Sequence, residues 1–98
     1  MPDQQTIERA RPDLIDEPVF DPTGDHIVIV FDNDYNTWDE VILVLQKATG
    51  CSLEEAENET WEVHHLGRSV VHHGDRDECH RAATIIRTIG IKVAVEQV

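Results

Sequence analysis

The hydrophobic positions of this chain fall into short blocks, and the spacing inside each block indicates its secondary structure. Residues 26–31 are almost continuously apolar, which is typical of a strand that is buried on both faces or lies in the middle of a sheet. Residues 91–95 alternate apolar and polar side chains, which predicts a half-exposed strand. Between them in sequence, residues 69–73 predict a further short strand. The pattern therefore supplies the strands of one small sheet.

The apolar block at residues 41–45 is ambiguous by spacing alone, because a short apolar run suits a strand or a helix. Thr37 and Glu40 resolve the ambiguity, since a threonine followed three residues later by a glutamate is a capping-box pattern that opens a helix. Gly50 supplies a left-handed residue that ends the helix. A helix is predicted over about residues 38–48.

Two further capping patterns open two further helices. Ser52 with Glu55 precedes the first, and Asp75 with Glu78 precedes the second, which Gly90 is predicted to end. The first helix has an apolar stripe at helical spacing, formed by Leu53, Ala56, Thr60 and Val63. Its predicted solvated face is formed by Glu54, Glu55, Glu57 and Glu59. The second is the clearest amphipathic helix of the chain, with one side formed by Cys79, Ala82, Ala83, Ile86 and Ile89.

In order, these elements predict a single β-α-α-β-α-β domain of the α+β class over residues 26–98, in which helices cover a three-stranded antiparallel sheet. Residues 1–25 hold all four prolines of the chain and show no hydrophobic periodicity, so they are predicted to form a flexible, disordered acidic tail. The apolar pairs at 14–15 and 19–20 are a docking motif, a patch packed on the domain, or part of a solvated leader.

Charge narrows the classes of partner. The chain has 20 acidic and 8 basic residues and a formal net charge of -12 at pH 7. Such a charge repels nucleic acids and anionic membranes, and it favours cationic partners. No signal peptide and no apolar run of about 20 residues is recognised in the sequence. A monomeric cytoplasmic protein that binds neither nucleic acid nor membrane is expected.

The sequence offers little for catalysis or metal binding. The histidine pairs at 64–65 and 72–73 invite a zinc hypothesis, but neighbours on a strand face opposite sides and the ligand spacing of a zinc site is missing. Cys79 lies on the apolar side of its helix, where a thiol is inert. Cys51 precedes a helix without a Gly-rich turn to hold an oxyanion. No cofactor and no enzymatic activity are predicted, and a metal or thiol enzyme is kept as a competing hypothesis.

Residues 32–38, Asp-Asn-Asp-Tyr-Asn-Thr-Trp, form the corner between the first strand and the first helix. Asx-rich stretches of this kind make turns, since their side chains bond their own backbone. Acidic and amide groups that point outward beside an apolar wall also suit a ligand with a cationic end and an apolar end. The residues of the corner leave both interpretations open.

Three segments together resemble the ClpS adaptor family: residues 28–38, residues 45–47, and Val-His-His-Leu-Gly-Arg at 63–68. The resemblance covers about residues 26–98. It implies an adaptor rather than an enzyme. Such proteins follow the N-end rule: they bind N-degron substrates through a bulky hydrophobic N-terminal residue and deliver them to a Clp AAA+ ATPase, ClpA- or ClpC-like, for degradation by the Clp protease.

By position, the resemblance implies that Asp32, Asn33 and His64 bind the α-amino group and first peptide of the substrate. Family members have an Asn-Asp pair at this corner, whereas this chain has Asp followed by Asn, which still supplies one acidic and one neutral acceptor. The implied pocket for the first side chain consists of Trp38, Val41, Thr60 and Val63.

Three positions depart from the family. Trp38 stands where relatives have a gating methionine, Thr60 replaces a second pocket methionine, and Ala82 replaces a lysine that docks on the ATPase. These differences concern substrate range and ATPase contact more than the fold. They keep open a second hypothesis, a ClpS-like protein-interaction domain that has lost recognition of N-terminal residues. The preferred first residue and the partner ATPase are left undetermined.

Overall fold

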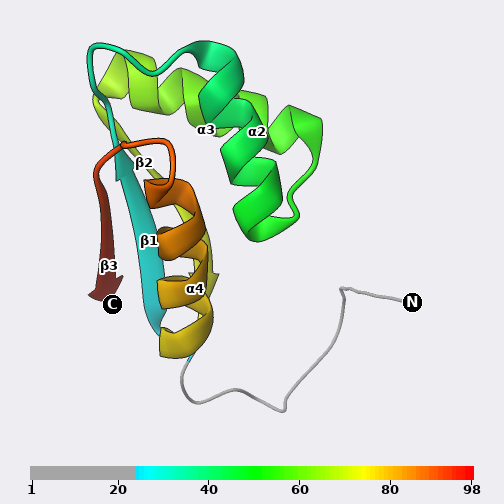
Figure 1. Ribbon diagram of the computed structural model, residues 1–98. Coiled ribbons are helices and arrows are strands. Elements are labelled where there is room, and N and C mark those ends of the chain that lie inside the picture. Colours follow the sequence, from blue (N-terminus) through cyan, green and yellow to red (C-terminus); the bar gives the residue numbers. More distant parts are fainter. Residues whose placement is uncertain (1–23) are drawn as a thin grey trace.

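The computed structural model describes residues 24–98 and contains three helices and three strands within that range (Figure 1). Their order confirms the predicted β-α-α-β-α-β chain and the α+β class. The elements are β1 His26–Phe31, α2 Trp38–Thr49, α3 Leu53–Leu66, β2 Arg68–Gly74, α4 Arg76–Arg87 and β3 Val93–Gln97. Of the predicted tail, residues 1–23 lie outside the described part of the chain, and its boundary with the domain stays a prediction.

β1 is the central strand of the sheet, whose order is β2-β1-β3 with both pairings antiparallel. Val28, Ile29 and Val30 are fully buried although their side chains alternate between the two faces, so β1 is covered on both sides as its continuous apolar pattern predicted. Its register with β2 shifts in the middle, because Val28 pairs with His72 and Ile29 pairs with Val70. The extra residue of β2 is a β-bulge, which bends the strand locally.

The three helices cover the sheet unequally. α4 lies across one face and contacts all three strands, whereas α2 and α3 pack against each other beyond one end of the sheet (Figure 1). Small residues on the buried side of α4, including Cys79, Ala82 and Ala83, allow it to lie close to the strands. α2 also contacts α4, and α3 also contacts β2. The end of β1 therefore runs into a junction of two helices, where the corner at residues 32–38 lies.

The predicted starts of the helices are confirmed by their capping contacts. The side chains of Thr37, Ser52 and Asp75 each accept a hydrogen bond from the backbone N–H three residues later. At Thr37 the capping box is complete, because the Glu40 carboxylate also accepts from the Thr37 backbone N–H at 2.9 Å. Gly50 ends α2 with the predicted left-handed conformation, at φ 73°.

The predicted end of α4 is wrong. The helix ends at Arg87 and its C-cap is Thr88, so Gly90 lies beyond it. Gly90 has φ +82°, and a Cβ at this position would lie 2.6 Å from the hydroxyl oxygen of Tyr35. The same hydroxyl donates a hydrogen bond to the Gly90 carbonyl at 2.8 Å. The positive φ is what favours glycine here, three residues after the end of α4, and the Tyr35 hydroxyl would have to shift to admit a Cβ.

Candidate functional site

Asn33 is used by the fold of the corner. Its side-chain oxygen accepts from the backbone N–H of Asn36 at 3.0 Å and of Tyr35 at 3.3 Å, and its amide nitrogen donates to the side-chain oxygen of Asn36 at 2.6 Å. This is the Asx-turn chemistry that the composition of the corner predicted as one of two interpretations. The oxygen that was predicted to accept from a substrate amine is directed into the turn.

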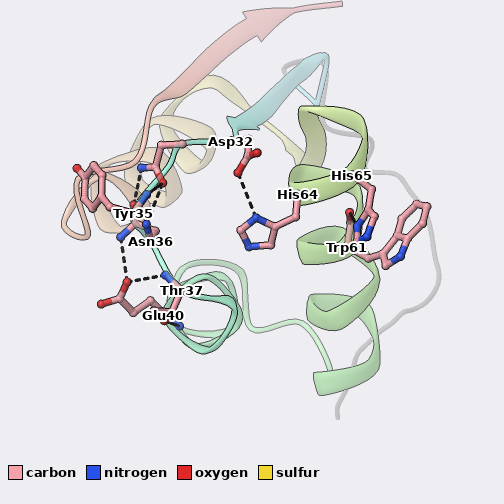
Figure 2. A network of polar contacts seen from close by, with 9 residues as sticks. Asp32, Tyr35, Asn36, Thr37, Glu40, Trp61, His64 and His65 are labelled. Carbon is pink, nitrogen blue, oxygen red and sulfur yellow. Dashed lines mark hydrogen bonds and ion pairs between the residues drawn. The ribbon is translucent and has the colours of Figure 1, made fainter.

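Asn36 ties the corner to two other elements. It is buried, and its amide nitrogen donates to Glu40 Oε1 at 3.1 Å and to the backbone carbonyl of Ile89 at 2.9 Å. Hydrogen bonds from the Thr37 backbone N–H and from Asn36 hold the pKa of Glu40 below its ordinary value. These bonds fix the start of α2 and the turn after α4 against the corner, and Figure 2 shows the contacts among Asn36, Thr37 and Glu40.

Asp32 and His64 are brought together from different elements. Asp32 directly follows β1, and its backbone N–H donates to the Gly67 carbonyl at 3.0 Å, which joins the corner to the end of α3. His64 Nδ1 lies 3.1 Å from Asp32 Oδ1, with side-chain exposures of 23% for the histidine and 35% for the aspartate. In Figure 2 the two side chains point toward each other across the gap between the corner and α3. Both groups are open enough for a ligand to reach.

The Trp38 ring stacks on His64, with ring centroids 5.7 Å apart and planes 19° apart. Trp38 and Val41 lie three residues apart on α2, and Thr60 and His64 lie four residues apart on α3, so each pair shares one side of its helix. The stack therefore turns these two sides toward each other.

Val41, Thr60 and Val63 are fully buried. The Thr60 hydroxyl donates to the Ala56 carbonyl at 2.7 Å, so its polar group is satisfied within α3. The predicted pocket residues lie on the helix sides next to the Asp32–His64 pair, but all three are fully buried, so a ligand side chain does not reach them in this arrangement.

Ala82 does not lie at a surface. It is 3% exposed, on the side of α4 that packs on the sheet. A side chain at this position cannot contact a partner protein without disrupting the core. The departure at Ala82 therefore concerns the core of the domain and not a partner-facing surface.

An aromatic pair on the outer side of α3 was missed by the sequence interpretation. The rings of Trp61 and His65 stack with centroids 4.4 Å apart and planes 12° apart, and Trp61 is 47% exposed (Figure 2). The signal was the four-residue spacing of the two rings, which places them on one face of a helix. Leu53, which was predicted to lie on the apolar stripe of this helix, is also exposed.

Glu59 corrects the predicted solvated face of α3. It is only 9% exposed, and its Oε1 has no hydrogen-bond partner among the described residues. It lies three residues after the buried Ala56, on the same side of the helix. Burial raises the pKa of Glu59 to about 7, the carboxylates of Glu55 and Glu62 add to the rise, and His72 opposes it.

The two cysteines are poorly suited to nucleophilic chemistry. Cys79 is buried and Cys51 is half-buried, and burial raises the pKa of both thiols, which keeps them protonated near neutral pH. Across residues 24–98, no three histidine, cysteine or acidic side chains converge as ligands for one metal ion. Within the same range, no helix has the length and apolar character needed to cross a membrane.

Comparison with known proteins gives three findings. A family model described as ATP-dependent Clp protease adaptor protein ClpS matches residues 21–93. The mouse (Mus musculus) E3 ubiquitin-protein ligase UBR2 is 32% identical over 71 residues, which is 72% of this chain and 4% of UBR2. The structure of Agrobacterium tumefaciens ClpS2 bound to L-phenylalaninamide shares the fold, with a TM-score of 0.70 and 20% identity over 74% of this chain and 95% of ClpS2.

Proposed function

The chain belongs to the ClpS family of non-catalytic adaptors for N-degron recognition, and we propose that it binds proteins beginning with a bulky hydrophobic residue and delivers them to a Clp ATPase-protease. The observation that supports this proposal most directly is the Asp32–His64 pair beside Trp38. The similar ClpS2 structure holds an amino acid amide with a free amine and an aromatic side chain, which is the same ligand chemistry.

The proposed amine site uses both members of the pair. A carboxylate only accepts hydrogen bonds, so the Nδ1 facing Asp32 carries the hydrogen and Nε2 of a neutral His64 is the acceptor. The second oxygen of Asp32 remains as another acceptor for the substrate. These two acceptors face different directions, because Nε2 lies on the side of the ring away from Asp32. A primary ammonium group donates to one of them and is attracted by the carboxylate charge, and the first peptide N–H of the substrate donates to the other. An acetylated terminus would leave acceptors unpaired, at a cost of roughly 1–3 kcal/mol.

Asn33 has a different part in this proposal from the one that the resemblance implied. Its oxygen is committed to the backbone of the corner, so Asn33 positions Asp32 rather than accepting from the substrate. Asp32 and His64 then carry recognition of the amine. This arrangement accounts for the reversed Asp-Asn order, because the acidic residue stands at the position that faces α3.

The proposed pocket for the first side chain opens when Trp38 turns away from His64. Val41, Thr60 and Val63 would then line it, with the hydroxyl of Thr60 already satisfied inside α3. Burying one leucine or aromatic side chain contributes roughly 1.5–3 kcal/mol. Together with hydrogen bonds to a charged group, each worth roughly 1.5–3 kcal/mol, roughly micromolar affinity is expected.

The second candidate function is a ClpS-like interaction domain without N-terminal recognition. The complete burial of Val41, Thr60 and Val63 favours this second function. If Trp38 stays stacked on His64, the proposed pocket remains closed. Residues outside position 82 would then mediate partner contact in either case. A cytoplasmic location, a monomeric state and the identity of the Clp ATPase remain predictions.

The test is a titration with peptides that begin with Leu, Phe, Tyr, Trp and Val, and with an acetylated Leu peptide of the same sequence. The adaptor proposal expects micromolar binding of the bulky free termini and at least tenfold weaker binding of the acetylated peptide. Equal binding of free and acetylated peptides would reject amine recognition. A pull-down with ClpA- and ClpC-type ATPases then tests delivery separately, because the second candidate expects either no ATPase binding or ATPase binding without peptide binding.

A further inference from the structure

Trp61 is an exposed aromatic ring that is held in one orientation. The His65 Nδ1–H donates to the Trp61 backbone carbonyl at 3.0 Å, because a carbonyl oxygen only accepts. This bond fixes the imidazole, on which the indole stacks at 4.4 Å. A ring that is already ordered loses little conformational entropy when a partner packs on it. Large ordered aromatic side chains of this kind are enriched among the residues that dominate protein–protein binding.

The ring lies next to the proposed amine site. Trp61 precedes His64 by three residues, which is about 4.5 Å along the helix axis and a neighbouring position on the helix surface. Figure 2 shows His64 on the side of α3 toward Asp32, and Trp61 with His65 further round the helix on its outer side. Glu57 lies one turn beyond Trp61 and is exposed. The amine site, an aromatic ring and a carboxylate therefore follow one another along α3.

This spacing matches a peptide that leaves the site in extended form. An extended chain advances about 3.3 Å per residue. The second or third residue of a substrate is then level with Trp61, and the fourth is level with Glu57, about 10 Å from His64 along the axis. Arginine and lysine side chains pack favourably on an indole face, and a carboxylate favours the same charge. The acidic residues Glu54 and Glu55 in the first turn of α3 extend this charge complementarity.

We propose that the outer face of α3 is a second subsite of this adaptor, in which Trp61 and Glu57 bind the residues that follow the N-terminal residue of the substrate and favour basic or aromatic side chains there. This proposal rests on the proposed function and deepens it. The first subsite selects a free amine and a bulky first side chain, and the second subsite selects the sequence behind them.

Three ligands test the proposal against the complete chain: leucinamide, the peptide Leu-Arg-Ala-Lys-Ala-amide and the peptide Leu-Glu-Ala-Glu-Ala-amide, each titrated by calorimetry at one salt concentration. We expect Trp61→Ala to weaken binding of the basic peptide about threefold, in line with an exposed cation–aromatic contact. The same change should leave leucinamide binding unaltered, because leucinamide has nothing behind its first residue. Far-ultraviolet circular dichroism checks that α3 is retained.

Leu53→Ala is the matched control, since Leu53 is also exposed and lies on the same helix, further from His64. It should change none of the three affinities. The overall negative charge of the protein favours the basic peptide in every variant, so the decisive quantity is the change caused by Trp61→Ala in the basic-to-acidic affinity ratio. An unchanged ratio would overturn the second subsite while leaving the amine site standing. Failure of leucinamide to bind would remove the proposed function, and the second subsite with it.

Discussion

Two tryptophan–histidine stacks share α3 but depend on different parts of the structure. In the first, Trp38 of α2 stacks on His64 of α3, and His64 also contacts Asp32 at the end of β1. In the second, Trp61 and His65 lie one turn apart on α3 itself. The first stack needs three elements to be in place, whereas the second needs only a helix.

The two pairs are suited to different kinds of contact. His64 lies in a position that only the folded domain creates, with an acidic partner on one side and an aromatic ring on the other. Such a position suits recognition of one ligand group in one orientation. Trp61 with His65 is an exposed and ordered surface. It suits contacts that vary from one substrate to the next.

Replacing the histidine of the first stack should change ligand binding most. His64→Ala should weaken leucinamide binding about 10- to 100-fold, because a hydrogen bond to a charged group contributes roughly 1.5–3 kcal/mol. His65→Ala is the matched control and should change leucinamide affinity less than about twofold, since it removes no proposed acceptor. Calorimetric titration of both variants measures the contrast. Similar losses in both would show that the two stacks are equivalent and that the amine site is misplaced.

The second test acts on the corner, on which only the first stack depends. Asn36→Ala removes the donor to the Ile89 carbonyl and to Glu40 from a buried position. We expect the free energy of unfolding to fall by about 2 kcal/mol, the usual effect of breaking a buried hydrogen-bond network. Urea denaturation measures the loss. Asn58→Ala, at an exposed position of α3, is the control and should stay within about 0.5 kcal/mol of the parent.

The third test acts on the helix that carries both stacks. Glu59 has a pKa of about 7 in the folded protein and an ordinary value of 4.5, so the folded state holds a proton that the unfolded chain releases between these values. Its contribution to stability is therefore greatest below about pH 4.5, falls as the pH rises toward 7, and is constant above that.

Glu59→Gln should remove this dependence. At pH 5 the variant and the parent should be similar, because a protonated glutamate resembles glutamine. At pH 8 the variant should be more stable by roughly 1–2 kcal/mol, from about 1.4 kcal/mol per pH unit of displacement with allowance for solvent screening. Thermal denaturation at the two pH values measures the difference. A parent more stable at pH 8 than the variant would contradict a buried, unpartnered carboxylate.

The smallest effect is expected from trimming the first stack rather than removing it. Trp38→Met leaves a flexible apolar side chain over the pocket walls. We expect the preference for a peptide that begins with Trp over one that begins with Leu to rise about fourfold, the effect of roughly one additional buried CH₂ group. Competition binding with the two peptides measures the ratio. A matching Trp61→Met change should leave the ratio unaltered, and a shift there would show that the two tryptophans share one pocket.

Much of the fold was predictable because its signals are local. The hydrogen bonds of Thr37, Ser52 and Asp75 each reach only three residues along the chain, so the sequence around them contains all the information. β1 was predicted with its observed bounds, because a continuous apolar run reports burial on both faces.

The errors have a common origin in contacts between elements. Glu59 lies on the buried stripe by spacing, but its residue type suggested a solvated position. α3 packs against both α2 and β2, which widens its buried side beyond what one apolar stripe indicates. Gly90 was predicted to end α4 from its place in the sequence, since no local pattern indicates that Tyr35 lies close to it.

The candidate site also has a part that local sequence predicts and a part that depends on contacts between elements. The composition of the corner allowed a turn or a site, and the structure assigns Asn33 and Asn36 to the turn and leaves Asp32 facing His64. The proximity of Asp32 to His64 was implied by resemblance to a family, since no local pattern connects a strand end with a helix that follows one helix later. Trp61 and His65 had a local signal, because their four-residue spacing places both rings on one face of α3.

The bonds from the corner to the turn after α4 also bear on the order of folding. Asn36 and Tyr35 bond to residues 53 and 55 positions further along the chain, so each bond closes a long loop and is expected late, after the local helices. During synthesis the α2 and α3 segments emerge before Ile89 and Gly90, to which the corner bonds. A partly synthesised chain would therefore possess the Trp61–His65 pair well before it could hold Asp32 against His64, and the proposed recognition of an amine would be among the last properties that the domain acquires.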